Sequence, residues 1–133
     1  MKKKAIIISL KGKILSKREK ILLTKESPWG VILFKRNIKS LNQIKKLTRQ
    51  IKILTKDKKF PIMIDEEGER VSRLSNIINN SFSARFFGNL YKKNKIFALN
   101  IFKQYINSLS KIFKDLGINI NTIPVLDVLK NKT

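Results

Sequence analysis

The sequence contains no cysteine and no histidine among its 133 residues. The absence of cysteine excludes disulfide bonds and thiolate metal ligands, and the absence of histidine removes the commonest general base. The five glycines are isolated, so there is no phosphate-binding loop, and the clustered carboxylates do not have the spacing of an EF-hand. We therefore expect neither a metal nor a cofactor. No apolar run approaches the ~18 residues of a membrane span, and no cleavage site follows the basic start, so neither membrane association nor secretion is expected.

Acidic residues are also scarce, with nine against thirty basic residues and a formal net charge of +21. A basic balance of this size is typical of proteins that bind nucleic acid. The basic residues are mostly lysines scattered along the chain, and stacking aromatics are not spaced among them. We interpret the charge as a solvated surface and expect no specific nucleic-acid partner. The alternative is a basic α/β module that binds nucleic acid or another anionic polymer, and its mark would be a contiguous Lys/Arg face.

Short apolar runs of strand length recur along the chain, and one of them, GVILF, is typical of a strand buried on both faces. They are Ala5–Leu10, Gly30–Phe34, Phe60–Ile64 and Thr122–Val128. Ser16 with Glu19 and Ser40 with Gln43 form capping-box patterns that predict helices between these runs.

A further amphipathic helix is predicted over Lys95–Leu116, with Gly117 as its C-cap. Its apolar face would contain Ile96, Leu99, Phe102, Ile106, Leu109, Phe113 and Leu116. The polar segment Ser75–Asn94 is predicted to be a long loop with at most a short helix. Alternating strands and helices predict one α/β domain over residues 1–133 with a parallel sheet. Ligand groups in such sheets follow the carboxyl ends of strands, where Asp65 and Asp127 lie.

The stretch PIMIDEEGERVSR concentrates four of the few carboxylates at the end of an apolar run. Asp65 ends the run directly, Gly68 permits a tight turn, and Arg70 and Arg73 are close enough to return over the strand end. A carboxylate beside a guanidinium group suits the binding of a sugar or another polyol, and it suits an internal salt bridge equally well. The remaining carboxylates are interpreted as helix-capping or loop-solvating groups: Glu66, Glu67 and Glu69.

Three segments resemble the bacterial β-N-acetylhexosaminidase branch of the family 3 glycoside hydrolases. These segments are WGVILFKRNIKSLNQIKKLTRQI, PIMIDEEGERVSRL and LGININTIPVLDV. Their order and intervals agree with the family from about Ile6 to Val128. The second segment resembles the family's Asp-x-Glu-Gly-Gly-Arg-Val-x-Arg motif, and Glu69 stands where that motif has its second glycine.

The resemblance implies a (β/α)₈ barrel that releases N-acetylglucosamine from peptidoglycan fragments in the cytoplasm. It assigns sugar binding to Asp65 and Arg73, with Asp127, Arg70 and Gly68 as supporting residues. A barrel of this type takes about 250 residues, so the chain is expected to be the N-terminal half of a truncated barrel. The family's acid/base and nucleophile lie in later segments, so no residue here is expected to be catalytic. The expected partners are an N-acetylglucosamine-containing saccharide and a complementing C-terminal half, and the chain alone is expected to be inactive.

Overall fold

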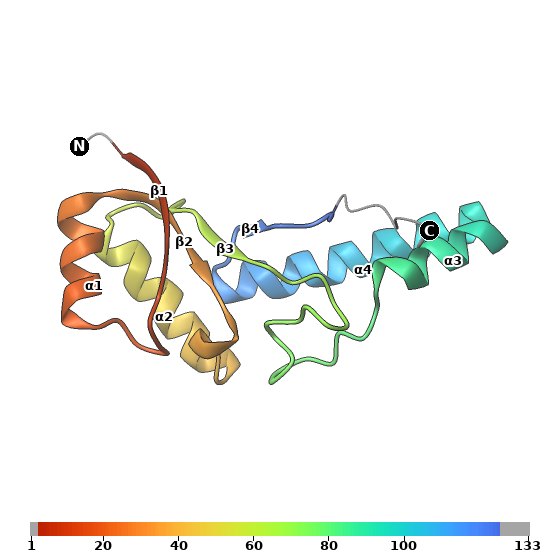
Figure 1. The fold of residues 1–133 in the computed structure, drawn as a ribbon, viewed down its shortest axis with the longest axis horizontal. Coiled ribbons are helices and arrows are strands. Elements are labelled where there is room, and N and C mark those ends of the chain that lie inside the picture. Colours follow the sequence, from red (N-terminus) through yellow and green to blue (C-terminus); the bar gives the residue numbers. More distant parts are fainter. Residues whose placement is uncertain (1–2, 126–133) are drawn as a thin grey trace, which may run out of the picture.

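The computed structural model describes residues 3–125, which form a four-stranded parallel sheet with its strands in sequential order (Figure 1). The strands are β1 (Lys4–Ser9), β2 (Pro28–Leu33), β3 (Ile62–Ile64) and β4 (Ile120–Asn121). Each neighbouring pair is parallel. The α/β class and the parallel sheet predicted from the alternating pattern are therefore confirmed.

The helices begin and end where local capping chemistry dictates. They are α1 (Lys17–Ile21), the π-helical turn η1 (Leu22–Glu26), the 3₁₀ turn η2 (Lys35–Asn37), α2 (Leu41–Leu54), α3 (Ala84–Lys93) and α4 (Lys95–Leu116). Ser16 and Glu19 form the predicted capping box of α1, and Ser40 caps α2. Gly117 ends α4 in the left-handed conformation, with φ 74°. The predicted loop contains one helix, α3, which Ser83 caps.

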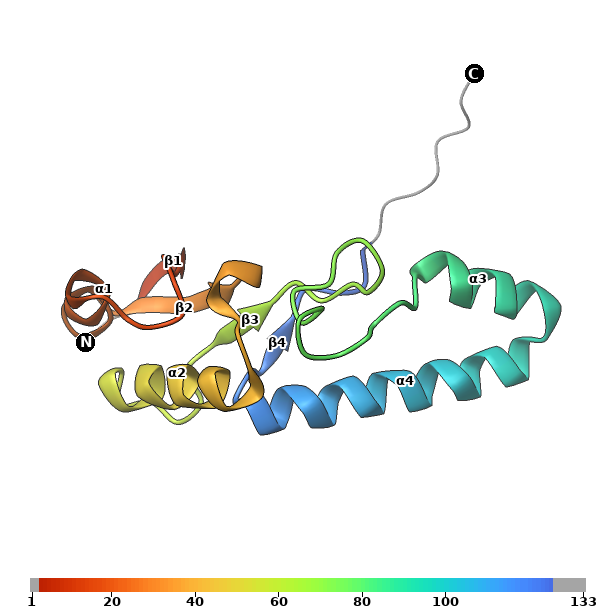
Figure 2. The same ribbon diagram turned by 90° about the horizontal axis from the view of Figure 1, so that it is seen from below.

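Helices α2 and α4 form a layer along one face of the sheet. Figure 2 shows them beneath the strands, where their ends meet. η1 packs against α2, and α2 packs against α4. A doubly wound sheet reverses its strand order and carries helices on both faces. Sequential parallel strands with one helix layer are instead the arrangement of a (β/α)₈ barrel segment. The predicted fold class is confirmed in this respect.

The hydrophobic core lies between this helix layer and the sheet. Val31 and Leu33 of β2 and Ile62 and Ile64 of β3 are fully buried. Ile32 lies beside Met63 in the register, on the opposite face of the sheet, and both are only half-buried. The prediction that β2 is buried on both faces is therefore wrong, because in the described part of the chain no helix covers the second face (Figure 2).

The fourth strand begins earlier than the sequence pattern predicts, and residues 126–128 of the predicted strand lie outside the described residues. Pairing with β3 involves Ile120 and Asn121, and the Thr122 amide donates to the Ile64 carbonyl oxygen at 3.1 Å. No strand is present over residues 122–125. The reason is that β3 ends at Ile64, and Pro124 has no N–H to continue a ladder. No helix within residues 3–125 combines the length and the hydrophobicity needed to cross a bilayer.

Candidate sugar-binding site

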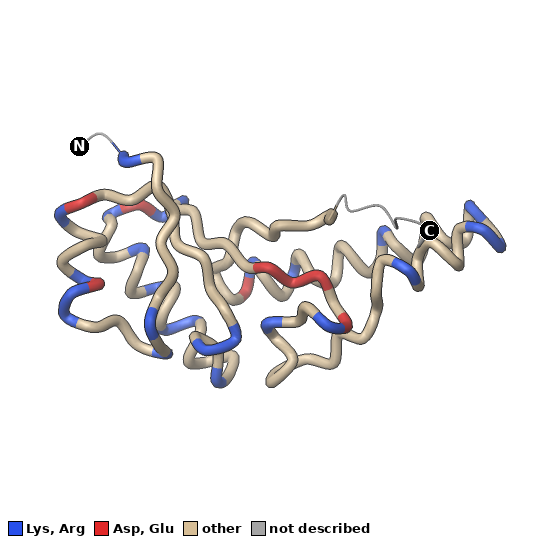
Figure 3. The backbone as a smooth tube through the Cα atoms, in the orientation of Figure 1, with Lys and Arg blue, Asp and Glu red and all other residues tan. Residues whose placement is uncertain are grey.

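The acidic stretch follows β3 and keeps its alternation of faces. Figure 3 shows it as the continuous red segment beyond that strand. Ile62, Ile64 and Glu66 are buried, whereas Met63 and Asp65 between them are half-buried. Because successive residues of a strand point to opposite faces, Glu66 turns toward the helix layer and Asp65 toward the uncovered face of the sheet. Neighbouring carboxylates therefore occupy different environments.

Glu66 is completely buried and organises the loop that follows it. Its Oε1 accepts hydrogen bonds from Ser72 Oγ at 2.7 Å and Asn80 Nδ2 at 2.8 Å. Its Oε2 accepts from the backbone N–H groups of Arg73 and Leu74 at 2.7 and 2.9 Å. The prediction that Glu66 merely caps a helix or solvates a loop is wrong. These bonds draw the backbone of Arg73 toward the end of β3.

The tight turn predicted at Gly68 is present. Gly68 has φ 90°, and a Cβ atom at this position would lie 2.2 Å from the Phe82 carbonyl oxygen. Its carbonyl accepts from the Val71 amide at 3.0 Å, which closes the turn. Glu69 also adopts a left-handed conformation, with φ 45°, and its amide donates to the Asn80 carbonyl. Glutamate thus occupies a conformation that glycine adopts without strain.

Asp65 and Arg73 meet at the carboxyl end of β3. Arg73 Nη2 lies 2.6 Å from Asp65 Oδ2, and Thr122 Oγ1 donates to Asp65 Oδ1 at 3.0 Å. The Arg73 and Asp65 side chains are 28% and 23% exposed, so the pair is partly open to solvent. The Arg73 guanidinium carbon also lies 5.6 Å from the centroid of the Phe34 ring, which follows β2. Three neighbouring strand ends therefore contribute to one site.

Arg73 retains one donor that the described residues do not use. Its Nε is buried and has no hydrogen-bond acceptor among residues 3–125. A buried N–H without an acceptor is costly, and such groups in native structures call for an explanation.

The other predicted site residues have different outcomes. Arg70 is exposed and pairs with no carboxylate in the described part of the chain, so the structure brings only Arg73 to Asp65. Gly68 lies in the turn as expected. Asp127 lies outside the described residues. No group of three acidic side chains suited to a metal ion occurs within residues 3–125.

A second group of polar residues, which sequence reasoning missed, supports the loop from behind. Tyr105 on α4 donates its hydroxyl to Asn80 Oδ1 at 3.0 Å, and Asn80 in turn donates to Glu66. Burial raises the pKa of Tyr105, the Asn80 hydrogen bond opposes this, and the Glu66 charge adds to it. Asn121 exchanges hydrogen bonds with the backbone of Glu66 at 3.0 and 3.1 Å. The one sequence signal for the burial of Glu66 was its place in the alternation, which puts it on the same face of the extended chain as Ile62 and Ile64.

Comparison with known proteins identifies this arrangement. No protein-family model matches the sequence. A β-hexosaminidase from Thioalkalivibrio sulfidiphilus is 30% identical over 92% of this chain and 35% of its own length. The crystal structure of NagZ from Neisseria gonorrhoeae in complex with N-trifluoroacetyl-D-glucosamine superposes with a TM-score of 0.83 at 29% identity. The superposition covers 95% of this chain and 37% of the NagZ chain. The chain is therefore similar to the N-terminal part of β-hexosaminidases, and its structural neighbours are NagZ and family 3 glycoside hydrolases.

The match to these family 3 glycoside hydrolases is confined to their N-terminal part. A family 3 β-N-acetylglucosaminidase from Paenibacillus superposes with a TM-score of 0.71 at 25% identity, over 92% of this chain and 23% of that one. The chain therefore spans about a third of the length of the curated family 3 relatives that it matches. The resemblance stated from the three sequence segments is confirmed.

Proposed function

We propose that this chain is the sugar-binding N-terminal part of a β-N-acetylhexosaminidase, with Asp65 and Arg73 holding an N-acetylglucosamine residue. The observation that carries the proposal is the Asp65–Arg73 pair, held at 2.6 Å beyond β3 and partly open to solvent. The carboxyl ends of barrel strands are where such enzymes bind their substrates. Because the similar proteins are named β-hexosaminidase, we propose a hexosaminide as the class of ligand.

The chemistry of the pair suits a hydroxyl-rich ligand. Each oxygen of Asp65 accepts one hydrogen bond within the protein, so each has a further lone pair for a sugar hydroxyl. The Arg73 side chain is 28% exposed, so the guanidinium N–H groups that Asp65 does not bind can donate to a sugar oxygen. Hydrogen bonds to charged groups are stronger than neutral ones and discriminate between hydroxyl positions.

Hydrolysis needs two further groups. A retaining glycosidase uses a nucleophilic carboxylate and an acid/base, whereas within residues 3–125 the one carboxylate paired with Arg73 is that of Asp65. Glu66 is buried behind it with both oxygens engaged, so it serves neither role. We propose that a complementing C-terminal half supplies the nucleophile and the acid/base. The complete site would then act in peptidoglycan-fragment recycling in the cytoplasm, as the family resemblance implies.

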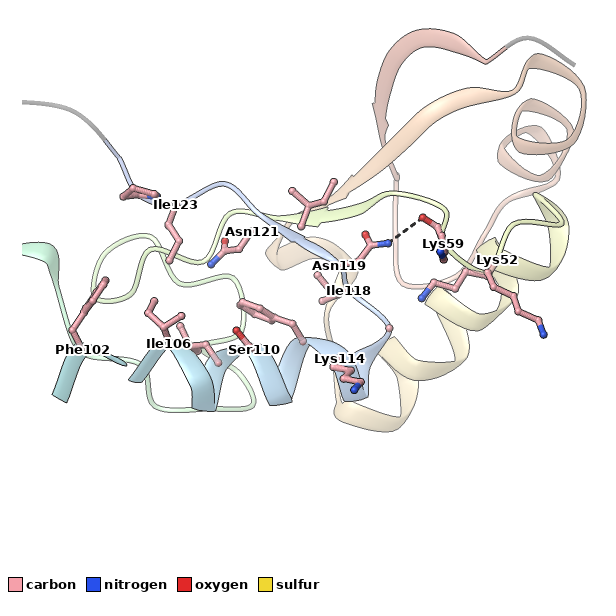
Figure 4. Close-up of a pocket in the computed structure, with 16 residues that line it drawn as sticks. Lys52, Lys59, Phe102, Ile106, Ser110, Lys114, Ile118, Asn119, Asn121 and Ile123 are labelled. Atoms are coloured by element: carbon pink, nitrogen blue, oxygen red, sulfur yellow. Dashed lines mark hydrogen bonds between the residues drawn. The ribbon is translucent and has the colours of Figure 1, made fainter. Parts of the chain in front are cut away.

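Apolar surfaces around the sheet support a complementing half. Ile6 and Ile7 are exposed on the edge strand β1. Between β4 and α4 lies a cavity of about 960 Å³, into which Phe102 and Ile106 of α4 project (Figure 4). An unpaired strand edge presents backbone donors and acceptors to another strand. Further parallel strands with their helices would pair with these edges and cover the apolar part of the cavity, around Phe102 and Ile106.

Titration with N-acetylglucosamine, followed by NMR, tests the sugar-binding proposal. Asp65→Asn keeps the side-chain shape and removes the charge, and we expect at least a tenfold loss of affinity because a charge-assisted hydrogen bond contributes about 1.5–3 kcal/mol. Arg70→Gln is the matched control, since Arg70 is exposed in the same loop and outside the pair. Equal affinities for the wild type, Asp65→Asn and Arg70→Gln would refute the proposal.

Assay of the chain alone on an aryl N-acetylglucosaminide tests the second part. We expect no hydrolysis above background, because we assign both the nucleophile and the acid/base to the complementing half. Turnover that Asp65→Ala abolishes would show that this chain holds its own catalytic groups. That result would contradict the need for a complementing half and leave the sugar-binding role intact.

A further inference from the structure

Positive charge gathers along one side of α2. Lys45, Arg49 and Lys52 are spaced by four and three residues, so they lie in one row along this helix. Lys45 and Arg49 are exposed, and Lys52 is half-buried. The core-facing side of the same helix contains Ile44 and Ile51. The row is therefore an exposed stripe of cations, in which like charges one turn apart repel each other.

This stripe forms one wall of a groove between α2 and the end of α4. The groove encloses about 540 Å³, and eleven residues line it. Six of them are basic and one, Asp115, is acidic. The basic groove, as we call it, is defined by Lys45, Arg49, Lys52, Lys56, Lys58 and Lys114. Figure 4 shows Lys52 and Lys114 where the ends of α2 and α4 meet. A contiguous basic face is thus present, although the lysines are scattered in the sequence.

None of these six cations forms an ion pair with a carboxylate within residues 3–125. The ion pairs of the described chain are Lys3–Asp57, Lys4–Glu26 and Arg73–Asp65. Uncompensated cations converging on one concavity raise the local electrostatic potential and attract an anion of matching extent. A single small anion would neutralise only a fraction of six charges. A chain of phosphates would neutralise most of them.

We propose that the basic groove binds the phosphate backbone of double-stranded nucleic acid without sequence selectivity. Five of its six cations are lysines, which bind phosphates as point charges and need no planar fork. No aromatic ring lines the groove, so it lacks the stacking platform that single-strand binders use. No carboxylate or amide side chain is positioned for base reading except Asp115. Contacts to the backbone alone give affinity without sequence preference.

The basic groove is separate from the proposed sugar site. It lies at the end of α2 and α4 and beside Lys58, which precedes β3, whereas Asp65 follows the opposite end of that strand. A substitution in the groove is therefore expected to leave sugar binding unchanged. Nucleic-acid binding goes beyond the glycosidase function, and each proposal can fail without the other.

The test is fluorescence anisotropy of a labelled 20-base-pair duplex of arbitrary sequence, over a series of salt concentrations. The groove variant is Lys45→Gln, Arg49→Gln and Lys52→Gln combined. We expect its plot of log affinity against log salt to be less steep by about 2.7, because each phosphate contact contributes about 0.9. Its affinity at low salt should fall at least tenfold. A second duplex of different sequence should bind the wild type equally well.

The matched control removes the same charge elsewhere. Lys92→Gln, Lys93→Gln and Lys103→Gln combined also takes three charges from the net +21, on exposed positions of α3 and α4. We expect its salt dependence to change by less than one unit. Circular dichroism verifies folding, and if the groove variant fails to fold, Lys58→Gln with Lys114→Gln replaces it, with an expected change of about 1.8.

Four results would overturn the proposal. One is an equal loss in the groove and control variants, because binding would then follow net charge alone. Another is the absence of duplex binding at low salt. A third is tighter binding of a single strand, or of anionic lipid vesicles, than of the duplex. The fourth is equal competition by polyglutamate at matched charge, which would make the groove a general acidic-polymer site.

Discussion

Helices α2 and α4 share the same apolar periodicity and differ in what covers it. The core-facing residues of α2 are almost completely buried, with Ile44 and Ile51 at 0% exposure. In the first half of α4, Ile96 is 76% and Leu99 58% exposed. Further along α4, Leu116 is buried again, where α2 and the sheet contact it. Periodicity therefore fixes the helix and its apolar face, whereas burial depends on the neighbours that the fold supplies.

Aromatic residues partly shelter the exposed half of α4. Phe87 of α3 lies with its ring centroid 4.9 Å from Phe102 and 5.0 Å from Tyr105, both on α4. Phe82 joins the same cluster with an edge-to-face contact, in which its ring centroid lies 5.8 Å from that of Tyr105. We call α3 and the first half of α4 the extension, and the remainder of the described chain the packed body. In the extension, α3 and α4 contact each other through aromatic side chains. The packed body instead has a core enclosed between the sheet and the helices.

Truncating one apolar residue in each helix should separate the two regions most clearly. Ile51→Ala removes a fully buried side chain and should lower the free energy of unfolding by about 2–5 kcal/mol. Leu99→Ala removes a side chain that is 58% exposed and should change it by less than about 0.5 kcal/mol. Urea denaturation followed by circular dichroism measures both. Similar losses would mean that Leu99 is covered in solution.

Replacing one glycine in each region should change the stability by smaller amounts and in opposite directions. Gly68→Ala, in the packed body, places a Cβ against the Phe82 carbonyl in a left-handed conformation, so we expect a loss of about 1–3 kcal/mol. Gly88→Ala lies in α3, where no atom is within 4 Å of the new Cβ. We expect it to stabilise the chain by about 0.5–1 kcal/mol through helix propensity. Thermal melts compare the variants, and a destabilising Gly88→Ala would argue against α3 as a helix.

The N-terminal caps of α1 and α3 should give the smallest difference in stability between the two regions. Only the cap of α1 is expected to depend on pH. Burial alone would raise the pKa of Glu19, but hydrogen bonds from Ser16 and Lys11 outweigh it and lower the pKa below 4.5. Because the folded pKa is depressed, the stabilisation is present above pH 4.5 and is lost as the pH falls through the folded value. Glu19→Gln should therefore cost about 0.5–1 kcal/mol at pH 7 and nothing at strongly acidic pH.

The Ser83 cap of α3 supplies the control for that pH dependence. Its first turn contains no acidic residue, so Ser83→Ala should cost a similar amount at neutral and acidic pH. A pH-independent cost of Glu19→Gln would contradict the role assigned to the Glu19 charge. Denaturant titrations at the two pH values provide both numbers.

Much of the fold was predictable because its signals are local. The Ser16 and Ser40 caps and the Gly117 C-cap each depend on a few neighbouring residues, so the sequence located α1, α2 and α4. The limits of β4 depend instead on a partner 57 residues away, because pairing stops where β3 ends. Likewise, the exposure of Ile32 depends on whether a second layer covers the sheet, which no local pattern reports.

The candidate site was predictable in the same uneven way. Asp65 was singled out by its position at a strand end, whereas Arg73 was selected over Arg70 only by the family resemblance. Glu66 was misread because acidic residues after a strand often solvate a loop or cap a helix, whereas Ser72, Asn80 and the loop backbone together satisfy it here. Arg70 was grouped with Arg73 by proximity along the chain, yet the turn at Gly68 directs the two side chains differently.

The central claim is that the Asp65–Arg73 pair binds N-acetylglucosamine, and the Arg73 Nε–H resonance tests it most directly. This donor is buried and has no acceptor among the described residues. We expect saturating sugar to shift its ¹H and ¹⁵N signals together with the amides of Asp65 and Thr122, and Asp65→Asn to abolish the shift. Sugar-induced shifts confined to other parts of the chain, with the Arg73 Nε–H signal unchanged, would contradict the account.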